Sequence, residues 1–314
     1  MAILVAVKGW DPAPWVERMR ARLPGRDIRA WPEDAGSGGD IDYVLAWKAP
    51  AELFSGLGNL KVIFSLGAGV DHLPPVDRHQ DIPVVRVVDP DLTDRMTEWV
   101  VMQVLLHHRQ HLAYAAQQEQ KRWRDLPQPA AKDVRVGILG LGVLGQASAL
   151  ALASLGFKVA GWARSRKQIT GVECFAGNDQ LDAFLRRTDI LVNLLPLTNE
   201  TRHFVDYAFL GKLARDGALG GPVFINAGRG ATQVESDLQL ALTDGTLKAA
   251  SLDVFEHEPL ESENPFWVMK NVILTPHIAA DSDPESLSSY IAEQIMTFEA
   301  GGKLANVVDP ATGY

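Results

Sequence analysis

The stretch Val134-Arg135-Val136-Gly137-Ile138-Leu139-Gly140-Leu141-Gly142-Val143-Leu144-Gly145 decides the fold of this chain. Residues 134–139 are almost entirely apolar and predict a buried strand, and residues 144–155 predict a helix. The pattern G-x-G-x-x-G between a strand and a helix is typical of a dinucleotide-binding loop. Gly140 permits the tight turn, Gly142 lets a pyrophosphate approach the backbone, and Gly145 lets helix and strand pack closely. The alternative is a glycine turn in an α/β domain that binds no nucleotide.

The residues after the next strand predict which dinucleotide binds. That strand, 158–162, is followed by Ala163, which lies 163 − 140 = 23 residues after Gly140. An NAD site usually has an acidic residue at this place for the ribose 2′-hydroxyl. Here Ala163 is followed by Arg164-Ser165-Arg166-Lys167, and guanidinium groups suit the oxygens of a 2′-phosphate. We therefore expect NADP(H) as the preferred cofactor and NAD(H) as the second choice. The alternative is a solvated basic turn.

Short apolar runs alternate with amphipathic stretches on both sides of the glycine loop. This alternation predicts parallel sheets covered by helices on both faces, in two α/β domains. The predicted strands are residues 3–7, 43–47, 62–65 and 84–88 in a first series, and 134–139, 158–162, 190–195, 223–226, 249–254 and 272–274 in a second. Residues 94–121 contain no Pro or Gly and predict one long connecting helix. Apolar residues in helical spacing from Leu287 to Phe298 predict a last helix that packs back on the first domain.

Composition excludes several classes of protein. The chain has 314 residues, 46% hydrophobic and 22% charged, which suits a globular protein of about two domains. Its net charge of −9 disfavours a nucleic-acid partner, and no apolar run is long enough for a membrane span. The apolar start at residues 2–7 predicts a strand rather than a signal peptide. The single cysteine, Cys174, forms no intrachain disulfide, so a cytoplasmic location is expected.

Three candidate reactive residues follow strands of the second series. They lie in the segments 226–230, 253–260 and 275–280. Open α/β sheets bind ligands at the carboxyl ends of their strands. Arg229 suits a substrate carboxylate because it binds it in bidentate fashion. His277 suits proton transfer near neutral pH, and a carboxylate such as Glu258 favours a charged histidine nearby. Taken singly, each residue fits a structural role better: Arg229 could cap a strand end, Glu258 could be a solvated loop acid, and His277 could be a structural histidine.

Together these motifs resemble the D-isomer-specific 2-hydroxyacid dehydrogenases, and within them the glyoxylate/hydroxypyruvate reductase A group. The resemblance runs over nearly the whole chain. The matching segments are 65–71, 140–145, 162–167, 194–196, 226–230, 253–260, 275–280 and the terminal Thr312-Gly313-Tyr314.

The resemblance implies a set of roles for this chain. The fold would be two doubly wound, Rossmann-like α/β domains. The dinucleotide-binding domain, 99–282, would be inserted into a discontinuous substrate domain, 1–98 and 283–314. Arg229, Glu258 and His277 would be catalytic, and Gly67, Ala68 and Gly69 would bind the substrate carboxylate through their main chain. The cofactor would contact Gly140, Gly142, Val143, Leu144, Gly145, Arg164, Ser165, Arg166, Leu195, Pro196, Ala227, Gly228, Asp253 and Ala279.

The implied reaction is NADPH-dependent reduction of glyoxylate to glycolate and of hydroxypyruvate to D-glycerate, with His277 as the proton donor. A homodimer formed by the cofactor domains is also implied, with the long helix and Trp123 at its interface. Two alternatives stay open: a dehydrogenase for a bulkier 2-oxo acid such as phenylpyruvate, and a non-catalytic dinucleotide-sensing scaffold of the same fold.

Trp47, Gly228 and three clustered histidines give further predictions. Trp47 is a candidate wall of the substrate pocket, or else an ordinary core residue. Gly228 stands where the family often has alanine, a change expected to loosen Arg229. His107, His108 and His111 do not follow a zinc-site pattern, so no metal is expected.

Overall fold

The computed structural model describes residues 1–36, 38–73 and 82–309, which divide into two compact units. Unit 1 is Met1–Leu92 with Ser282–Tyr314, and unit 2 is Thr93–Asp281. In the sequence, unit 2 is thus inserted between the two segments that form unit 1. The expected boundaries, after residues 98 and 282, differ from these because helix α3 (Pro90–His108) runs through the first boundary without a break.

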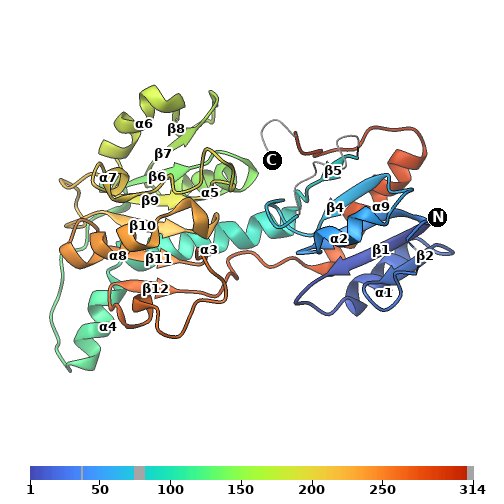
Figure 1. The fold of residues 1–314 in the computed structure, drawn as a ribbon. Coiled ribbons are helices and arrows are strands. Elements are labelled where there is room, and N and C mark those ends of the chain that lie inside the picture. The colour runs from blue at the N-terminus through green and yellow to red at the C-terminus, as the bar shows by residue number, and fades with distance from the viewer. Residues whose placement is uncertain (37, 74–81, 310–314) are drawn as a thin grey trace. The chain divides into compact units, whose positions relative to one another are not determined.

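Unit 1 is built on a parallel sheet of five strands. The strand order is β2-β1-β3-β4-β5. Its elements are β1 (Ala2–Val7), α1 (Ala13–Arg22), β2 (Asp27–Ala30), β3 (Ile41–Trp47), α2 (Ala51–Ser55), β4 (Val62–Ser65), β5 (Val84–Val85) and α9 (Pro284–Glu299). Alternate residues of β1 point to opposite faces. Ile3 and Val5 pack against α1 and α9, whereas Leu4 packs on the α2 side. The last helix therefore does complete the core of the first domain, as its spacing predicts (Figure 1).

Unit 2 is built on a parallel sheet of seven strands in the order β12-β11-β10-β9-β6-β7-β8. The strands are β6 (Arg135–Leu139), β7 (Lys158–Ala163), β8 (Glu173–Ala176), β9 (Ile190–Asn193), β10 (Val223–Asn226), β11 (Ala249–Leu252) and β12 (Val272–Leu274). The helices are α3, α4 (His111–Glu119), α5 (Val143–Ser154), α6 (Gly177–Arg186), α7 (Tyr207–Leu210) and α8 (Glu235–Asp244), with short 3-10 turns at Ala131–Asp133, Gly230–Thr232 and Pro265–Val268. Side chains of α3 and α5 share one core cluster with alternate sheet residues, and those of α6, α7 and α8 share the other. Both faces of the sheet are therefore covered, which confirms the predicted fold class.

The prediction of one helix over residues 94–121 is wrong. The segment forms two helices, α3 and α4, which are separated at Arg109 and Gln110. Gln110 adopts a left-handed conformation with φ 56° and ψ 38°, which ends the regular helix without Gly or Pro. The redirected α4 supports the following linker, since the Tyr114 hydroxyl accepts a hydrogen bond from the Leu126 N–H at 3.1 Å. This tertiary contact overrides local helix propensity.

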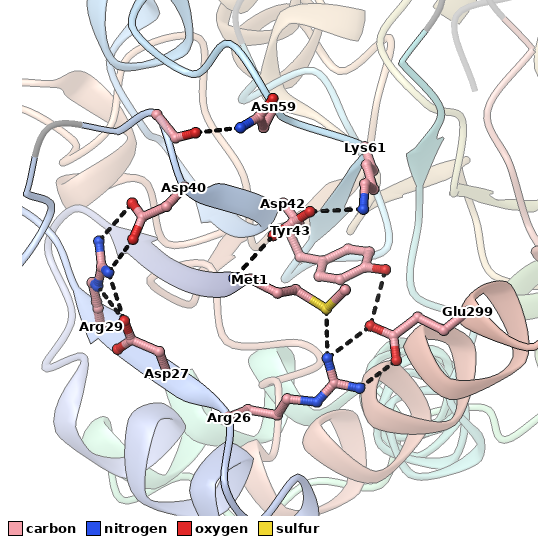
Figure 2. A network of polar contacts seen from close by, with 11 residues as sticks. Met1, Arg26, Asp27, Arg29, Asp40, Asp42, Tyr43, Asn59, Lys61 and Glu299 are labelled. Atoms are coloured by element: carbon pink, nitrogen blue, oxygen red, sulfur yellow. Dashed lines mark hydrogen bonds and ion pairs between the residues drawn. The ribbon is translucent and has the colours of Figure 1, made fainter.

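A polar network at the amino ends of the unit 1 strands fastens α9 to the sheet (Figure 2). Glu299, in the last turn of α9, accepts hydrogen bonds from Arg26 at 3.0 Å and from the Tyr43 hydroxyl at 3.3 Å. Burial and then the charge of Glu299 raise the pKa of Tyr43 above its ordinary value. Nearby, Asp42 pairs with Lys61 at 2.8 Å. Because ligand sites of such sheets lie at the carboxyl ends of strands, we assign this network a structural role.

None of the helices in the described ranges is long and apolar enough to cross a membrane.

Candidate active site

The glycine loop joins β6 to α5 in unit 2, and its glycines are required by close packing of the chain on itself. Gly140 has φ +103°, and a Cβ there would lie 3.0 Å from the carbonyl oxygen of Leu194. A Cβ on Gly145 would lie 1.9 Å from the carbonyl oxygen of Gly140, so only glycine lets the first turn of α5 lie against the loop.

Gly142 differs, because a Cβ there would meet nothing within 4 Å. Gly142 is exposed and is the N-cap residue of α5, whose first N–H groups need acceptors. The open space before a helix amino end suits a pyrophosphate, so the loop fits a dinucleotide. Of the other two predicted contacts here, Val143 is exposed and Leu144 is half-buried.

The basic turn after β7 is exposed, including Arg164, Ser165 and Arg166. Glu200, which the sequence did not single out, lies within electrostatic reach of Arg164. A hydrogen bond from the Thr198 side chain is the main cause that lowers the pKa of Glu200, and the Arg164 charge adds to it. The turn therefore offers cationic groups that are accessible to an anionic ligand.

The loops that follow β9 and β10 lie against each other. The Leu195 N–H donates to the Asn193 side chain at 3.3 Å, and the Pro196 carbonyl accepts from the Thr201 hydroxyl at 2.6 Å. A Cβ on Gly228 would lie 2.7 Å from the carbonyl oxygen of Leu195, so an alanine here would need a shift of the backbone. Ala227, at the same junction, is buried.

Arg229 is held by buried amides beneath it. Its Nη1 donates to the Gly228 carbonyl at 2.8 Å. Its own carbonyl accepts from Asn226 at 3.3 Å and from the Thr232 hydroxyl at 2.6 Å. Asn226, which is fully buried, also accepts from Asn193 at 3.0 Å and from the Gly228 N–H at 3.0 Å. The expectation that Gly228 loosens Arg229 finds no support in these contacts, because the side chains of Asn226 and Thr232 hold the main chain of both residues.

His277 and Glu258 form a close pair. His277 Nδ1 lies 2.7 Å from Glu258 Oε2, and the other carboxylate oxygen accepts from the Phe255 N–H at 3.1 Å. Both side chains are partly exposed, at 35% for His277 and 23% for Glu258. An Nδ1–H that donates to the carboxylate leaves Nε2 as the ring atom available for proton transfer.

Asp253 fixes the loop that carries His277. Its Oδ1 accepts from the Thr275 hydroxyl at 2.5 Å and from the Ile278 N–H at 2.9 Å. Its Oδ2 accepts from the Ala279 N–H at 2.9 Å. Asp253 is buried, and its hydrogen bonds hold the 275–279 loop in place. That Asp253 and Ala279 also contact the cofactor stays a prediction.

In unit 1, the predicted Gly67–Gly69 loop follows β4, and Trp47 ends β3. Gly67 is buried, whereas Ala68 and Gly69 are half-buried. A Cβ on Gly67 would lie 2.6 Å from the Trp47 ring, so glycine is needed for the loop to pack on the indole. Trp10 stacks on Trp47 with ring centroids 4.6 Å apart. Trp47 is thus half-buried, with part of its ring covered by Trp10 and Gly67. Its place in the wall of a substrate pocket stays a prediction.

The three clustered histidines do not converge. His107 Nε2 lies 2.8 Å from the Ser251 hydroxyl, while the His108 ring packs edge-on against Phe157. His111 is exposed on α4. Within the described ranges, no group of three or more His, Cys, Asp or Glu side chains is placed to hold a metal ion.

Comparison with known proteins establishes the family. The sequence model described as "D-isomer specific 2-hydroxyacid dehydrogenase, NAD binding domain" matches residues 101–279. Glyoxylate/hydroxypyruvate reductase A of Escherichia fergusonii is 39% identical and aligns over 100% of both chains. The Serratia proteamaculans protein of the same name is 40% identical over 96% of each chain.

The chain belongs to the D-isomer-specific 2-hydroxyacid dehydrogenase family.

Solved structures of this dehydrogenase family agree in fold. An NADPH-dependent glyoxylate/hydroxypyruvate reductase from Sinorhizobium meliloti, in complex with NADP and sulfate, is 50% identical, has a TM-score of 0.95 and covers 100% of this chain and 99% of its own. A probable 2-hydroxyacid dehydrogenase from Rhizobium etli, in complex with NADP, HEPES and L(+)-tartaric acid, is 47% identical with a TM-score of 0.94 and the same coverage. The terminal Thr312-Gly313-Tyr314, one of the matching segments, lies outside the described residues.

Several residues that support the candidate site received no role of their own from the sequence. They are Ser65, His72, Asn193, Asn226 and Gln233, the last of which accepts a hydrogen bond from Asn226 at 2.9 Å. All but His72 are fully buried. A polar residue at the end of an otherwise apolar strand is the one signal that could have identified three of them, Ser65, Asn193 and Asn226, since such residues are buried only with hydrogen-bond partners.

Proposed function

We propose that this enzyme uses NADPH to reduce small 2-oxo acids, converting glyoxylate to glycolate and hydroxypyruvate to D-glycerate. The observation that carries the proposal is the Glu258–His277 pair, 2.7 Å apart, in a unit that also holds Arg229 and a glycine loop fit for a dinucleotide. The full-length similarity to glyoxylate/hydroxypyruvate reductases supports the choice of substrate.

Each residue has a defined task in the proposed reaction. NADPH supplies a hydride to C2 of the oxo acid. His277 gives the proton from Nε2 to the carbonyl oxygen, so that an alcohol forms. Glu258, which holds Nδ1, orients the ring for this transfer. Arg229 binds the carboxylate and stabilises the charge that develops on oxygen.

A direct assay tests this function. NADPH oxidation is followed by nicotinamide absorbance with glyoxylate, hydroxypyruvate, pyruvate and phenylpyruvate in parallel, and the series is repeated with NADH. We expect turnover of the first two acids with NADPH. His277→Ala should lower turnover by about 10³-fold while NADPH still binds. If none of the four acids were reduced although NADPH still bound, the dinucleotide-sensing scaffold would be favoured. If phenylpyruvate were reduced fastest, a dehydrogenase for a bulkier 2-oxo acid would be favoured.

We further propose that the exposed turn after β7 selects NADP(H) over NAD(H). The double variant Arg164→Ala and Arg166→Ala should lose tenfold or more in NADPH affinity, with little change for NADH, because charge-assisted hydrogen bonds to a 2′-phosphate would be removed. Arg186→Ala, at an exposed arginine of α6 that pairs with Asp182, is the matched control. Equal losses for both cofactors would refute this assignment.

The assembly and location are also proposals. We expect a homodimer formed through the cofactor domain, since Trp123 is 99% exposed and Met102 and Tyr114 present further apolar surface. Sedimentation of the wild type and of Trp123→Glu tests this, and an unchanged dimer in the variant would remove Trp123 from the interface. The cytoplasmic location rests on Cys174 being the single cysteine.

A further inference from the structure

A buried serine lies at the centre of the predicted carboxylate-binding loop. Ser65 is the last residue of β4 and is fully buried. Its hydroxyl lies 2.9 Å from the carbonyl oxygen of Gly67, 2.9 Å from that of Gly69 and 2.9 Å from His72 Nε2. The Gly67 N–H also donates to it at 3.2 Å. One hydroxyl therefore fixes both ends of the loop and contacts one histidine.

The donor and acceptor capacity of the Ser65 hydroxyl assigns a direction to each of its four hydrogen bonds. A serine hydroxyl has one proton to donate and two lone pairs to accept with. The two carbonyl oxygens accept only, so they share the Ser65 proton, and the Gly67 N–H occupies one lone pair. The second lone pair is left for an N–H on His72 Nε2. In agreement, His72 Nδ1 accepts from the Lys48 N–H at 3.4 Å, which leaves Nε2 as the nitrogen that donates to Ser65.

These bonds orient the loop main chain. In a trans peptide the C=O and the following N–H point in opposite directions, and neither peptide here is cis. Because the Gly67 and Gly69 carbonyls turn toward Ser65, the N–H groups of Ala68 and Val70 turn away from it. The loop thereby presents donors on the side opposite its buried serine, which is the arrangement that an anionic ligand needs.

His72 also connects the loop to Trp47. The two rings lie with centroids 4.4 Å apart, and Trp47 in turn packs on Gly67. A displaced His72 would therefore disturb the loop in two ways, through Ser65 and through the indole.

We propose that His72, acting through Ser65, is a positioning residue that holds the loop main chain in the conformation that binds the substrate carboxylate. This inference rests on the proposed function, since it assigns the carboxylate of that reaction to this loop. His72 does not touch the reacting atoms in the proposal; it sets the direction of the N–H donors.

The test compares three variants in the full chain. Ser65→Ala removes the central hydroxyl, His72→Phe keeps a ring against Trp47 but removes the donor, and His72→Gln restores an N–H near the position of Nε2. We expect Ser65→Ala and His72→Phe to raise the KM for glyoxylate about tenfold with a much smaller change in kcat, because the loop binds the carboxylate in ground and transition states alike. His72→Gln should recover most of the loss. The matched controls are Ser262→Ala and His111→Phe, two exposed positions.

A second measurement does not depend on turnover. Calorimetric titration with oxamate, a small carboxylate inhibitor, in the presence of NADPH should show the same tenfold weakening, with NADPH affinity unchanged. A purely structural role predicts a lower melting temperature and a lower active fraction with an unchanged KM, and that result would overturn the proposal. Unchanged KM and oxamate affinity in an active enzyme would overturn it while leaving the proposed function intact. A wild-type protein that neither reduces glyoxylate nor binds oxamate would overturn both.

Discussion

His107 provides a pH-dependent prediction because the fold keeps this histidine neutral. It lies on α3, and its Nε2 is 2.8 Å from the hydroxyl of Ser251 on β11. Ser251 donates its own proton to Gln103 at 2.8 Å, so it accepts the bond from His107. Burial, and then the charge of Lys248, lower the pKa of His107 from 6.5 to about 4.

The sign and size of the effect follow from linkage. The unfolded chain binds a proton at His107 more readily than the folded chain, so stability rises with pH through this group. Its contribution is fully present above about pH 6.5 and is lost progressively as the pH falls toward about 4. A pKa of about 4 against 6.5 corresponds to about 3 kcal/mol over the whole window, of which about 2 kcal/mol is lost between pH 7 and pH 5.

The assay is urea unfolding of the wild type and of His107→Gln at pH 7 and at pH 5. Glutamine does not titrate, but it keeps an N–H donor for Ser251. We expect the wild type to lose about 2 kcal/mol more than the variant between the two pH values. Contributions from other groups cancel in this comparison, including His108, whose pKa is also lowered by burial. His111→Gln, at an exposed position of α4, should behave as the wild type. If wild type and His107→Gln lost the same free energy of unfolding between pH 7 and pH 5, the conclusion that burial lowers the pKa of His107 would be refuted.

Three further predictions concern candidate site residues of unit 2. Gly145→Ala should weaken NADPH binding tenfold or more, because its Cβ would come within 1.9 Å of the Gly140 carbonyl oxygen; titration with NADPH measures this, and retained affinity would contradict it. Glu258→Gln keeps the shape of the pair with His277 but removes its charge, so kcat/KM should fall by about 10²-fold at unchanged NADPH affinity; steady-state kinetics showing wild-type values would exclude a role for the carboxylate. Asp253→Asn places an NH₂ group against N–H or O–H donors, so we expect a lower melting temperature together with lower kcat, and calorimetry that shows no destabilisation would contradict the loop-support role.

The sequence predicts the central strands and the glycine loop well because they carry strong local signals. Strands β6 and β9 are buried on both faces, so they are continuous apolar runs that are easy to locate. The edge strands β2 and β8 were not predicted, since Asp27-Ile28-Arg29-Ala30 and Glu173-Cys174-Phe175-Ala176 mix polar and apolar residues. Their pairing with β1 and β7 is what makes them strands, and pairing partners are not visible in a local pattern. The helix break at Gln110 was not predicted either, because no Gly or Pro marks it and the contact of Tyr114 with Leu126 is not visible in a local pattern.

The candidate site divides along a similar line. Arg229, Glu258 and His277 could be singled out as candidates because each lies in a segment after a strand, where ligands bind in such sheets, and the family resemblance then implied their roles. Ser65 and His72 could not, because the significance of a serine or histidine depends on the atoms that it contacts. They are seven positions apart in the sequence, and the 2.9 Å contact between them exists only once the loop has folded back.

One physical rule connects the positioning residues of both units. At the carboxyl ends of the strands lie polar side chains that are fully or almost fully buried: Ser65 ends β4, Asn193 ends β9, Asn226 ends β10, and Asp253 directly follows β11. Burial of an unpaired polar group would destabilise the fold, so each of these side chains is stable there only while the next loop satisfies its hydrogen bonds. The loops that carry the candidate ligand-binding groups are thereby held in one conformation by the sheet itself. It follows that a substitution at these strand ends should alter ligand binding or turnover even though none of the four side chains needs to contact the substrate.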